Sequence, residues 1–360
     1  MRIVLLMLPA LALAQGPRTP EGKPDFSGMY DITTLTPVSR PAAYGTRKSL
    51  TEQEARAQAK AMEDKAVEFN KASDPNRAAP PKGGARPAGV TGAPEAFEGA
   101  AGNVGGYNQV WVDFGNQAFK LEGQYRTSII VDPPNGNVPP MTPEAMKRAA
   151  TSNRALYAEF GRPNRGDAWW IKEGVSPGPY DDPEMRPLAE RCIVSFGQSA
   201  MTPALPNYFY NNLKQIVQTK NTVVIFNEMI HDARIVRMNA KHDPPEIRKW
   251  GGDSVGHWEG EVLVIDTTNF RDESVLQGAD RNLHVIEKFS RIDGKTLLYQ
   301  FTIDDPTVWT KTWSGEMPWA ATDGRIYEYA CHEGNYSFGN ILRGARLLEA
   351  EAMKQSGPPK

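Results

Sequence analysis

The sequence contains only two cysteines in 360 residues, and it has no surplus of charge of either sign. Its 41 basic residues are balanced by 43 acidic residues, which leaves a net charge of −2. Proteins that bind nucleic acid generally need a surplus of Lys and Arg to neutralise phosphates. The charge balance therefore argues against a nucleic acid as the partner.

Several motifs of standard chemistries are also missing. The sequence has no G-x-S-x-G elbow, no P-loop, no G-x-G-x-x-G after a predicted strand and no C-x-x-C pair. These absences disfavour nucleotide-dependent and redox-cofactor chemistry, so we predict no cofactor. No internal repeat of solenoid or propeller period is present.

Long apolar runs are missing except near the N-terminus. Residues 3–13 are apolar and follow Arg2, and Ala12 and Ala14 form an A-x-A cleavage pattern. The run is shorter than the about 20 residues that cross a bilayer, and no cysteine follows it as a lipid anchor would require. We predict a cleavable signal peptide over residues 1–14, no membrane span and a periplasmic or secreted location; the alternative is an uncleaved anchor.

Export determines how the two cysteines are interpreted. In an oxidising compartment, Cys192 and Cys331 are expected to form a disulfide rather than a metal pair. The bond would join the segment before the predicted sheet to its last strand. Two free buried thiols are the alternative.

The sequence does contain hairpin-like segments in its C-terminal part. Residues 254–258 and 261–268 flank Glu259-Gly260, and residues 283–292 and 295–303 flank Asp293-Gly294. Asp-Gly between β-rich runs indicates a hairpin, because both central residues of a type I′ turn need positive φ. Further strands are predicted over residues 24–33, 108–113, 125–131, 213–219, 222–229, 233–238, 307–313 and 325–331.

These segments predict a mainly β fold, an antiparallel up-and-down meander that closes into a barrel with a ligand cavity. The Gly28-Met29-Tyr30 spacing is similar to the Gly-x-Trp strand of lipocalin-like proteins, with Tyr in place of Trp. The expected fold is therefore a lipocalin-like barrel with helical insertions.

We predict one β-rich domain over residues 15–346, with insertions at residues 50–106 and 142–187. The first insertion begins with a helix over residues 51–72, and the second with a helix that runs from Thr142 to about Phe160. A closing helix is predicted over residues 342–354, and residues 347–360 are assigned to a C-terminal tail.

Titratable residues recur in the predicted strands, where retaining them for packing alone would be costly. Side chains alternate between the two faces of a strand, so one set points into the barrel. The predicted catalytic residues are His257, His284, Glu287, Tyr329 and His332.

A second group of residues is predicted to bind the ligand. Phenols beside His and Glu are suited to proton transfer or to polar ligand binding in a cavity. The alternative is that the tyrosines fill one end of the barrel and that Asp232 caps a turn. The predicted ligand-binding residues are Glu228, His231, Tyr327, Glu333 and Tyr336.

A metal site is a further alternative. His257 and Glu259 share a strand face, and with His284 or His332 they outline a facial triad. Glu259, however, lies in a predicted turn, and no pair has zinc-finger or H-E-x-x-H spacing. We therefore predict no metal ligand and keep a His/carboxylate metal-dependent enzyme as an alternative.

Four segments carry a resemblance to a known group of proteins. They are GDSVGHWEGEVLVIDTTNF at residues 252–270, YACHEGNY at 329–336, NNLKQIVQ at 211–218 and RTSIIVDPP at 126–134. With these segments the chain resembles a large, uncharacterised family of exported bacterial proteins over most of residues 25–346. The resemblance implies a secreted or periplasmic location and one β-rich domain, and it implies no reaction or catalytic residue.

Together, these features predict an exported β-barrel protein that binds a small organic ligand. We favour a cofactor-independent acid/base enzyme, a lyase, isomerase or hydrolase, in which imidazoles and phenols converge in a hollow, polar-lined interior. The alternative is a non-catalytic carrier of lipocalin type, in which the inner face holds apolar side chains and the histidines lie outside. The apolar set would be Leu263, Ile265, Val285 and Phe289. The sequence sets neither the substrate nor the oligomeric state.

Overall fold

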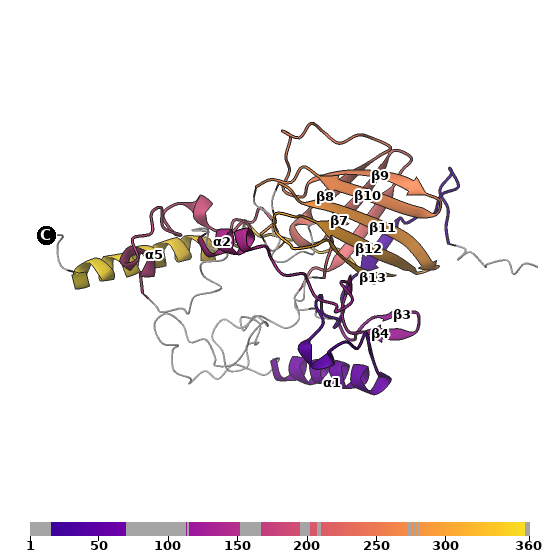
Figure 1. The fold of residues 1–360 in the computed structure, drawn as a ribbon, viewed down its shortest axis with the longest axis horizontal. Helices are drawn as coiled ribbons and strands as arrows, with labels where there is room; N and C mark the ends of the chain where they lie inside the picture. The colour runs from indigo at the N-terminus through magenta and orange to yellow at the C-terminus, as the bar shows by residue number, and fades with distance from the viewer. Residues whose placement is uncertain are drawn as a thin grey trace, which may run out of the picture.

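Nine strands close into a β-barrel in the computed structural model of the chain (Figure 1). The structure describes residues 16–69, 113, 115–151, 167–194, 202–206, 210–272, 276, 278–279 and 281–356. The strands follow the order β1-β6-β7-β8-β9-β10-β11-β12-β13, and the barrel closes because β1 also pairs with β13. Their bounds are β1 Gly28–Asp31, β6 Leu213–Gln218, β7 Thr222–Asn227, β8 Ala233–Met238, β9 Asp253–Glu259, β10 Val262–Thr268, β11 His284–Asp293, β12 Thr296–Asp304 and β13 Trp313–Ala321.

The predicted barrel is confirmed, with one difference in its topology. Both predicted hairpins form, as β9–β10 and β11–β12. The barrel is mixed rather than purely antiparallel, because β8 and β9 run parallel, with Val236 beside Ser254. A parallel pair needs a connection that returns the chain to the starting end. Residues 239–252 make this connection, which we call the crossover.

The barrel interior is filled by large side chains. Along most of the barrel strands, buried residues alternate with more exposed ones, as in β12, where Leu297, Tyr299, Phe301 and Ile303 face inward. The inner face of β10 and β11 carries Leu263, Ile265, Val285 and Phe289, the set that the sequence predicted for a carrier. The interior is therefore an aromatic and aliphatic core around a few polar groups.

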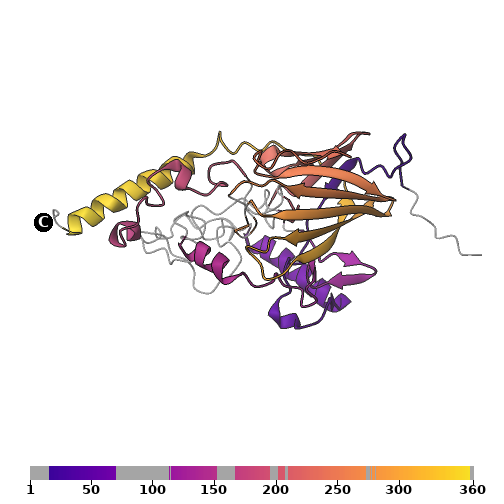
Figure 2. The ribbon, with the colours of Figure 1, turned by 45° about the horizontal axis from the view of Figure 1, so that its top comes forward.

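Smaller elements surround the barrel (Figure 2). Strand β5 (Ile130–Asp132) pairs with β13, and β2 (Ser49–Leu50), β3 (Lys120–Leu121) and β4 (Gln124–Arg126) form a separate small sheet. Within the described residues, the helices are α1 (Glu52–Phe69), α2 (Pro143–Thr151), α4 (Trp169–Lys172) and α5 (Tyr336–Ser356), and the 3-10 turns are η1 (Ala42–Tyr44), η4 (Pro183–Met185) and η5 (Met229–His231). None of the helices in the described ranges has the length and hydropathy that a membrane crossing needs.

The predicted N-terminal helix is confirmed as α1, with its capping box in place. The backbone N–H of Glu54 donates to Thr51 Oγ1 at 3.2 Å, and the N–H of Thr51 donates to Glu54 Oε2 at 2.8 Å. Helix α2 begins at Pro143 after the Thr142 cap, as predicted.

Helix α5 begins earlier than predicted and continues into the expected tail. Asn335 accepts the N–H of Phe338 at 3.3 Å and so provides a cap upstream of the predicted start. The helix projects away from the barrel (Figures 1 and 2). Trp170 donates its indole N–H to Glu349 on this helix at 2.8 Å.

Two predicted strands are wrong. Residues 307–312 form a turn instead, because Asp305 accepts the backbone N–H groups of Val308 and Trp309, and β13 begins only at Trp313. Residues 325–331 form no strand, and the N–H of Tyr327 donates to the Glu228 side chain rather than to a neighbouring strand. The predicted signal peptide and, except for Asp113, the predicted strand at residues 108–113 lie outside the described residues.

The predicted disulfide is confirmed. Cys192 and Cys331 are bonded across a sequence separation of 139 residues. The bond joins the segment that precedes β6 to the chain between β13 and α5.

Candidate functional site

Six inward-facing side chains from six strands lie near one another inside the barrel, and we call them the inner cluster. They combine an amine, a guanidinium, a carboxylate, two phenols and an indole in an interior that is otherwise mainly apolar. Its members are Tyr30 of β1, Lys214 of β6, Arg234 of β8, Glu287 of β11, Tyr299 of β12 and Trp319 of β13.

An ion pair crosses the interior between β8 and β11. Both terminal nitrogens of Arg234 contact the Glu287 carboxylate, and the Tyr299 hydroxyl donates to Glu287 Oε1 at 2.7 Å. Burial opposes the charge on Arg234, but Glu287 outweighs that effect and raises the pKa of the guanidinium. Burial also raises the pKa of Tyr299 well above its ordinary value. Arg234 and Glu287 therefore form a buried ion pair in which both groups are charged, and Tyr299 is a neutral hydrogen-bond donor to it.

A segment outside the sheet contacts the inner cluster directly. Residues 202–206, which we call the plug segment, are buried, and Ala204 and Leu205 belong to the barrel core. Arg234 donates to Thr202 Oγ1 at 2.9 Å, and the N–H of Ala204 donates to the Tyr299 hydroxyl at 2.9 Å. The plug segment thus presents a hydroxyl and an N–H to the polar groups of the interior.

Lys214 is fully buried on the inner face of β6. Its Cα partners are Tyr30 on β1 and Asn227 on β7. Burial lowers the pKa of Lys214 to about 7, although the nearby carboxylates of Glu228 and Asp232 favour its charge. A lysine with such a pKa is a base or a nucleophile near neutral pH, whereas an ordinary lysine is protonated.

The walls beside the inner cluster are aromatic. The Trp319 ring lies 5.0 Å from Tyr299, 5.1 Å from Phe289 and 6.3 Å from Tyr30, measured between ring centroids. Its indole N–H is buried without an acceptor. Buried tryptophans usually find a hydrogen-bond partner, so such a donor calls for an explanation.

A second polar network lies on the outer face of the barrel, and we call it the outer network. His284 Nε2 and His242 Nε2 lie 3.0 and 3.2 Å from the same oxygen of Asp266, and His242 Nδ1 lies 3.1 Å from Asp253. The hydrogen bond that His284 donates to the Asp266 carboxylate raises the pKa of His284 and lowers the pKa of Asp266. Because His242 belongs to the crossover, these contacts fasten the crossover to β9 and β10.

Asp253 is the buried centre of the outer network and is only 2% exposed. Burial opposes its ionisation, but hydrogen bonds from Lys249, the N–H of Asp243 and His242 hold the pKa of Asp253 well below its usual range. Arg237 also donates to it at 2.8 Å. The preceding Gly252 has φ 75°, and a Cβ there would come within 2.6 Å of the Thr267 side chain. At the end of the crossover, the backbone of Gly252 therefore lies so close to Thr267 that only glycine fits there.

The structure does not bring the predicted catalytic residues together. Glu287 lies inside the barrel, whereas His257 and His284 lie on its outer face, where His257 contacts Glu259 at 3.4 Å. Tyr329 and His332 lie on the chain between β13 and α5. The expected convergence of imidazoles inside the barrel is therefore absent for His257 and His284. In the described part of the chain, no group of three His, Cys, Asp or Glu residues is arranged to hold a metal ion.

The predicted ligand-binding residues are also divided. Glu228 is buried and accepts the N–H of Leu213 at 3.3 Å and that of Tyr327 at 3.2 Å. His231 is exposed, and its Nε2 lies 2.7 Å from the Tyr327 carbonyl oxygen. Tyr327, Glu333 and Tyr336 are exposed as well. Of this group, Glu228 is the residue that lies near the inner cluster.

The sequence analysis did not select Lys214, Tyr299 or the plug segment. A signal for Lys214 is present, since it is two residues before Ile216 and so shares the face of an apolar residue. Tyr299 carries the same signal, because it lies two residues after Leu297 and two residues before Phe301 and so shares their face of the strand. The plug segment has no periodic pattern that would place it inside a barrel.

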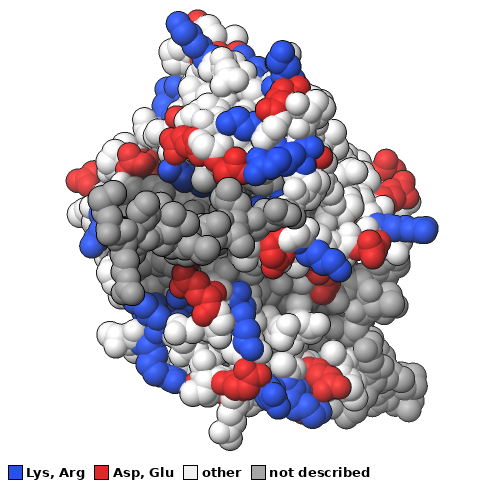
Figure 3. All heavy atoms as spheres, turned by 90° about the vertical axis from the view of Figure 1, so that its right-hand side faces the viewer, with Lys and Arg blue, Asp and Glu red and all other residues white. Residues whose placement is uncertain are grey.

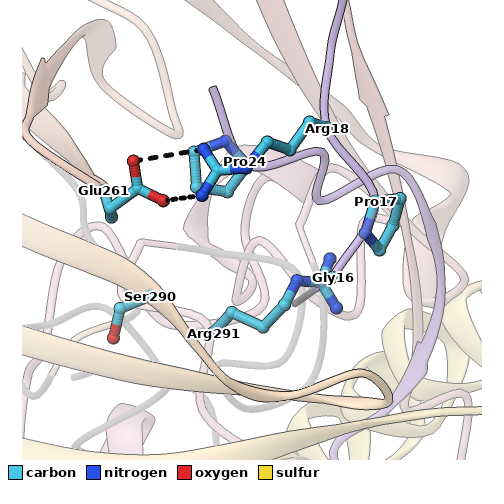
Figure 4. A pocket seen from close by; sticks show the side chains of 7 residues that line it. All are labelled: Gly16, Pro17, Arg18, Pro24, Glu261, Ser290 and Arg291. Atoms are coloured by element: carbon cyan, nitrogen blue, oxygen red, sulfur yellow. Dashed lines mark hydrogen bonds and ion pairs between the residues drawn. The ribbon is translucent and has the colours of Figure 1, made fainter. Parts of the chain in front are cut away.

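A pocket lies between the N-terminal segment and the barrel, and charged side chains that line it already form structural contacts (Figure 4). There Arg18 forms two hydrogen bonds to Glu261, at 3.2 and 2.7 Å. Arg291 donates to the carbonyl of Asp25 and lies over the Phe26 ring. Acidic and basic side chains are interspersed on the surface in Figure 3. The inner cluster is therefore the stronger candidate site.

Comparison of the chain with family models, curated proteins and solved structures finds no match.

Proposed function

We propose that the protein binds a small organic molecule at the inner cluster, in the space that the plug segment takes. One observation carries this proposal: polar and charged groups of the barrel interior contact a segment that belongs to no strand. Retaining ionised groups in a protein interior costs several kcal/mol per ion before pairing compensates. Their retention is explained if they recognise a ligand when the plug segment withdraws.

The contacts of the plug segment indicate the chemistry of the ligand. An oxygen in the place of Thr202 Oγ1 would accept from Arg234, and the Tyr299 hydroxyl accepts a donor in the place of the Ala204 N–H. The indole N–H of Trp319 can donate to a further oxygen. The neighbouring aromatic rings favour a planar apolar body. The proposed ligand is thus a small aromatic compound with a carbonyl or carboxylate oxygen.

We also propose that the protein is exported to the periplasm or secreted. The disulfide supports this location, because such bonds persist mainly in oxidising compartments. A lipocalin-type carrier is the simplest form of the proposal.

The binding proposal is tested with Trp319→Phe, which keeps an aromatic ring at this position and removes the unpartnered indole N–H. Benzoate and benzaldehyde are titrated against intrinsic fluorescence, and the variant is expected to bind them about 5- to 10-fold more weakly, the loss of one hydrogen bond of about 1–1.5 kcal/mol. Hydrogen exchange at the Ala204 amide should accelerate when the wild-type protein is saturated.

Three variants outside the barrel interior serve as controls, namely Trp169→Phe, His257→Ala and His284→Ala. Each should bind the two probes with wild-type affinity. Loss of binding in a histidine variant with unchanged binding in Trp319→Phe would move the site to the outer face and contradict the proposal.

Acid/base catalysis on the bound ligand is a second candidate function. It is favoured by Lys214, which has a pKa of about 7 and lies near the carboxylates of Glu228 and Asp232. A base of that pKa can remove a proton next to a carbonyl group at neutral pH. Deuterium exchange of the acetophenone methyl group in heavy water should then be faster with the wild-type protein than with Lys214→Met. Equal exchange rates would contradict catalysis by Lys214 and would support only the binding function.

A further inference from the structure

We propose that Lys214 forms an imine with an aldehyde or ketone group of the bound molecule. The inference rests on the proposed function and narrows the ligand to carbonyl compounds. It is carried by the position of the amine, which lies inside the barrel among groups that can transfer protons.

The first argument is the direction in which Lys214 points. On β6, Lys214 and Ile216 are buried, whereas the alternate residues Gln215 and Val217 are exposed. The lysine on β11, Lys288, faces outward and pairs with Glu259 at 3.3 Å. Lys214 therefore places its amine inside the barrel, where the proposed ligand lies.

The second argument is that the amine can be neutral there. Only an unprotonated amine attacks a carbonyl carbon, and burial of Lys214 disfavours its ammonium form. The positive charge of Arg234 nearby acts in the same direction. Lysines on the surface behave oppositely: hydrogen bonds to Asp243 and Asp253 raise the pKa of Lys249.

The third argument is that proton carriers lie close to the amine. The Glu228 carboxylate and Asp232 both act on Lys214 electrostatically. Desolvation raises the pKa of Asp232, which favours its protonated form, and because the residue is exposed it can exchange that proton with solvent. Glu228 is buried and balances a positive charge formed on the nitrogen.

The reaction balances with these groups alone. The Nζ lone pair attacks the carbonyl carbon, and the carbon–oxygen π pair moves to the oxygen, which takes a proton. The nitrogen loses a proton to a carboxylate, and the carboxyl so formed protonates the carbinolamine hydroxyl. The hydroxyl leaves as water while the nitrogen lone pair forms the C=N bond, and the iminium nitrogen gives its last proton to the group that first protonated the oxygen. In total, one carbonyl compound and one amine give one imine and one water, and no oxidant or reductant is needed.

The experiment traps the imine in the native protein. Benzaldehyde is added at pH 7 with sodium cyanoborohydride, which reduces an imine to a stable benzyl amine, and the modified peptides are mapped by mass spectrometry. We expect Lys214 to be labelled on the order of a hundredfold faster than the surface lysines, because a much larger share of its amine is neutral at that pH. The labelling rate should rise with a midpoint near pH 7.

Each outcome decides the inference. Labelling that saturates with benzaldehyde and maps to Lys214 supports it, and Lys214→Met should lose that label while the matched outward variant Lys288→Met keeps it. Labelling confined to surface lysines overturns it. Saturable binding of benzaldehyde and benzoate without an adduct at Lys214 overturns the imine and leaves the proposed function standing. Absence of both binding and adduct overturns both. The peptide map of the wild-type protein keeps the test valid if Lys214→Met does not fold.

Discussion

Replacing Glu287 with leucine is expected to lower the free energy of unfolding by about 3–5 kcal/mol. The substitution leaves the Arg234 guanidinium charged and buried without its carboxylate, and the Tyr299 hydroxyl loses its acceptor. Breaking a buried pair is costly because the surviving charge keeps its desolvation penalty. Urea unfolding followed by fluorescence measures the effect as a lower midpoint with an unchanged slope.

The double variant Arg234→Met/Glu287→Leu separates the pair from general damage to the core. Removing both charges is expected to restore most of the stability, since apolar residues often replace a buried ion pair at little cost. The matched control is Lys288→Leu, the next residue on β11, which faces outward and should change stability by less than about 0.5 kcal/mol. A single variant as stable as the wild type would mean that Arg234 finds another partner.

The double variant also bears on the proposed function. Arg234 holds the plug segment through Thr202, so its removal should loosen that segment even where global stability is restored. Hydrogen exchange at the Ala204 amide reports this loosening directly. A stable barrel with a loosened plug segment and lost benzoate binding would assign the ion pair to recognition rather than to folding.

Much of the barrel could be predicted from the sequence because its determinants are local. Alternation along residues 296–304 and the Asp293-Gly294 turn define β11 and β12 without reference to the rest of the chain. The capping pair Thr51 and Glu54 defines the start of α1 in the same way.

The inner cluster could not be predicted, because it depends on contacts between distant segments. Arg234 and Glu287 are 53 residues apart, and they meet only because the barrel closes. The parallel pairing of β8 and β9 depends on the path of the crossover, for which the sequence shows no hairpin signal. Without that path, His242 could not be placed beside His284. The predicted site therefore combined Glu287, which faces inward, with histidines that face outward.

Replacing Asp253 with alanine is expected to lower the free energy of unfolding by about 2–4 kcal/mol, the upper range for a buried carboxylate whose donors are cationic. The substitution removes the acceptor of Lys249 and Arg237, at 2.8 Å each, and of His242. Lys249 and His242 belong to the crossover and fasten it to the barrel, so the crossover should become accessible to limited proteolysis. Urea unfolding gives the stability, and the matched control is Asp272→Asn, which breaks only an exposed pair with Arg281 and should change little.

The same network predicts how stability depends on pH. The pKa of Asp253 and that of Asp266 are lowered in the folded state, so their contribution is present above about pH 4, the unfolded value, and is lost as the pH falls through the lowered values. The pKa of His284 is raised, so its contribution is present below about pH 6.5 and is lost as the pH rises through the raised value. The outer network should therefore stabilise the fold most between about pH 4 and 6.5, and Asp253→Ala should flatten the acid limb of a plot of unfolding free energy against pH. An acid limb of equal steepness in both proteins would show that other carboxylates govern acid unfolding and that the crossover is held without Asp253.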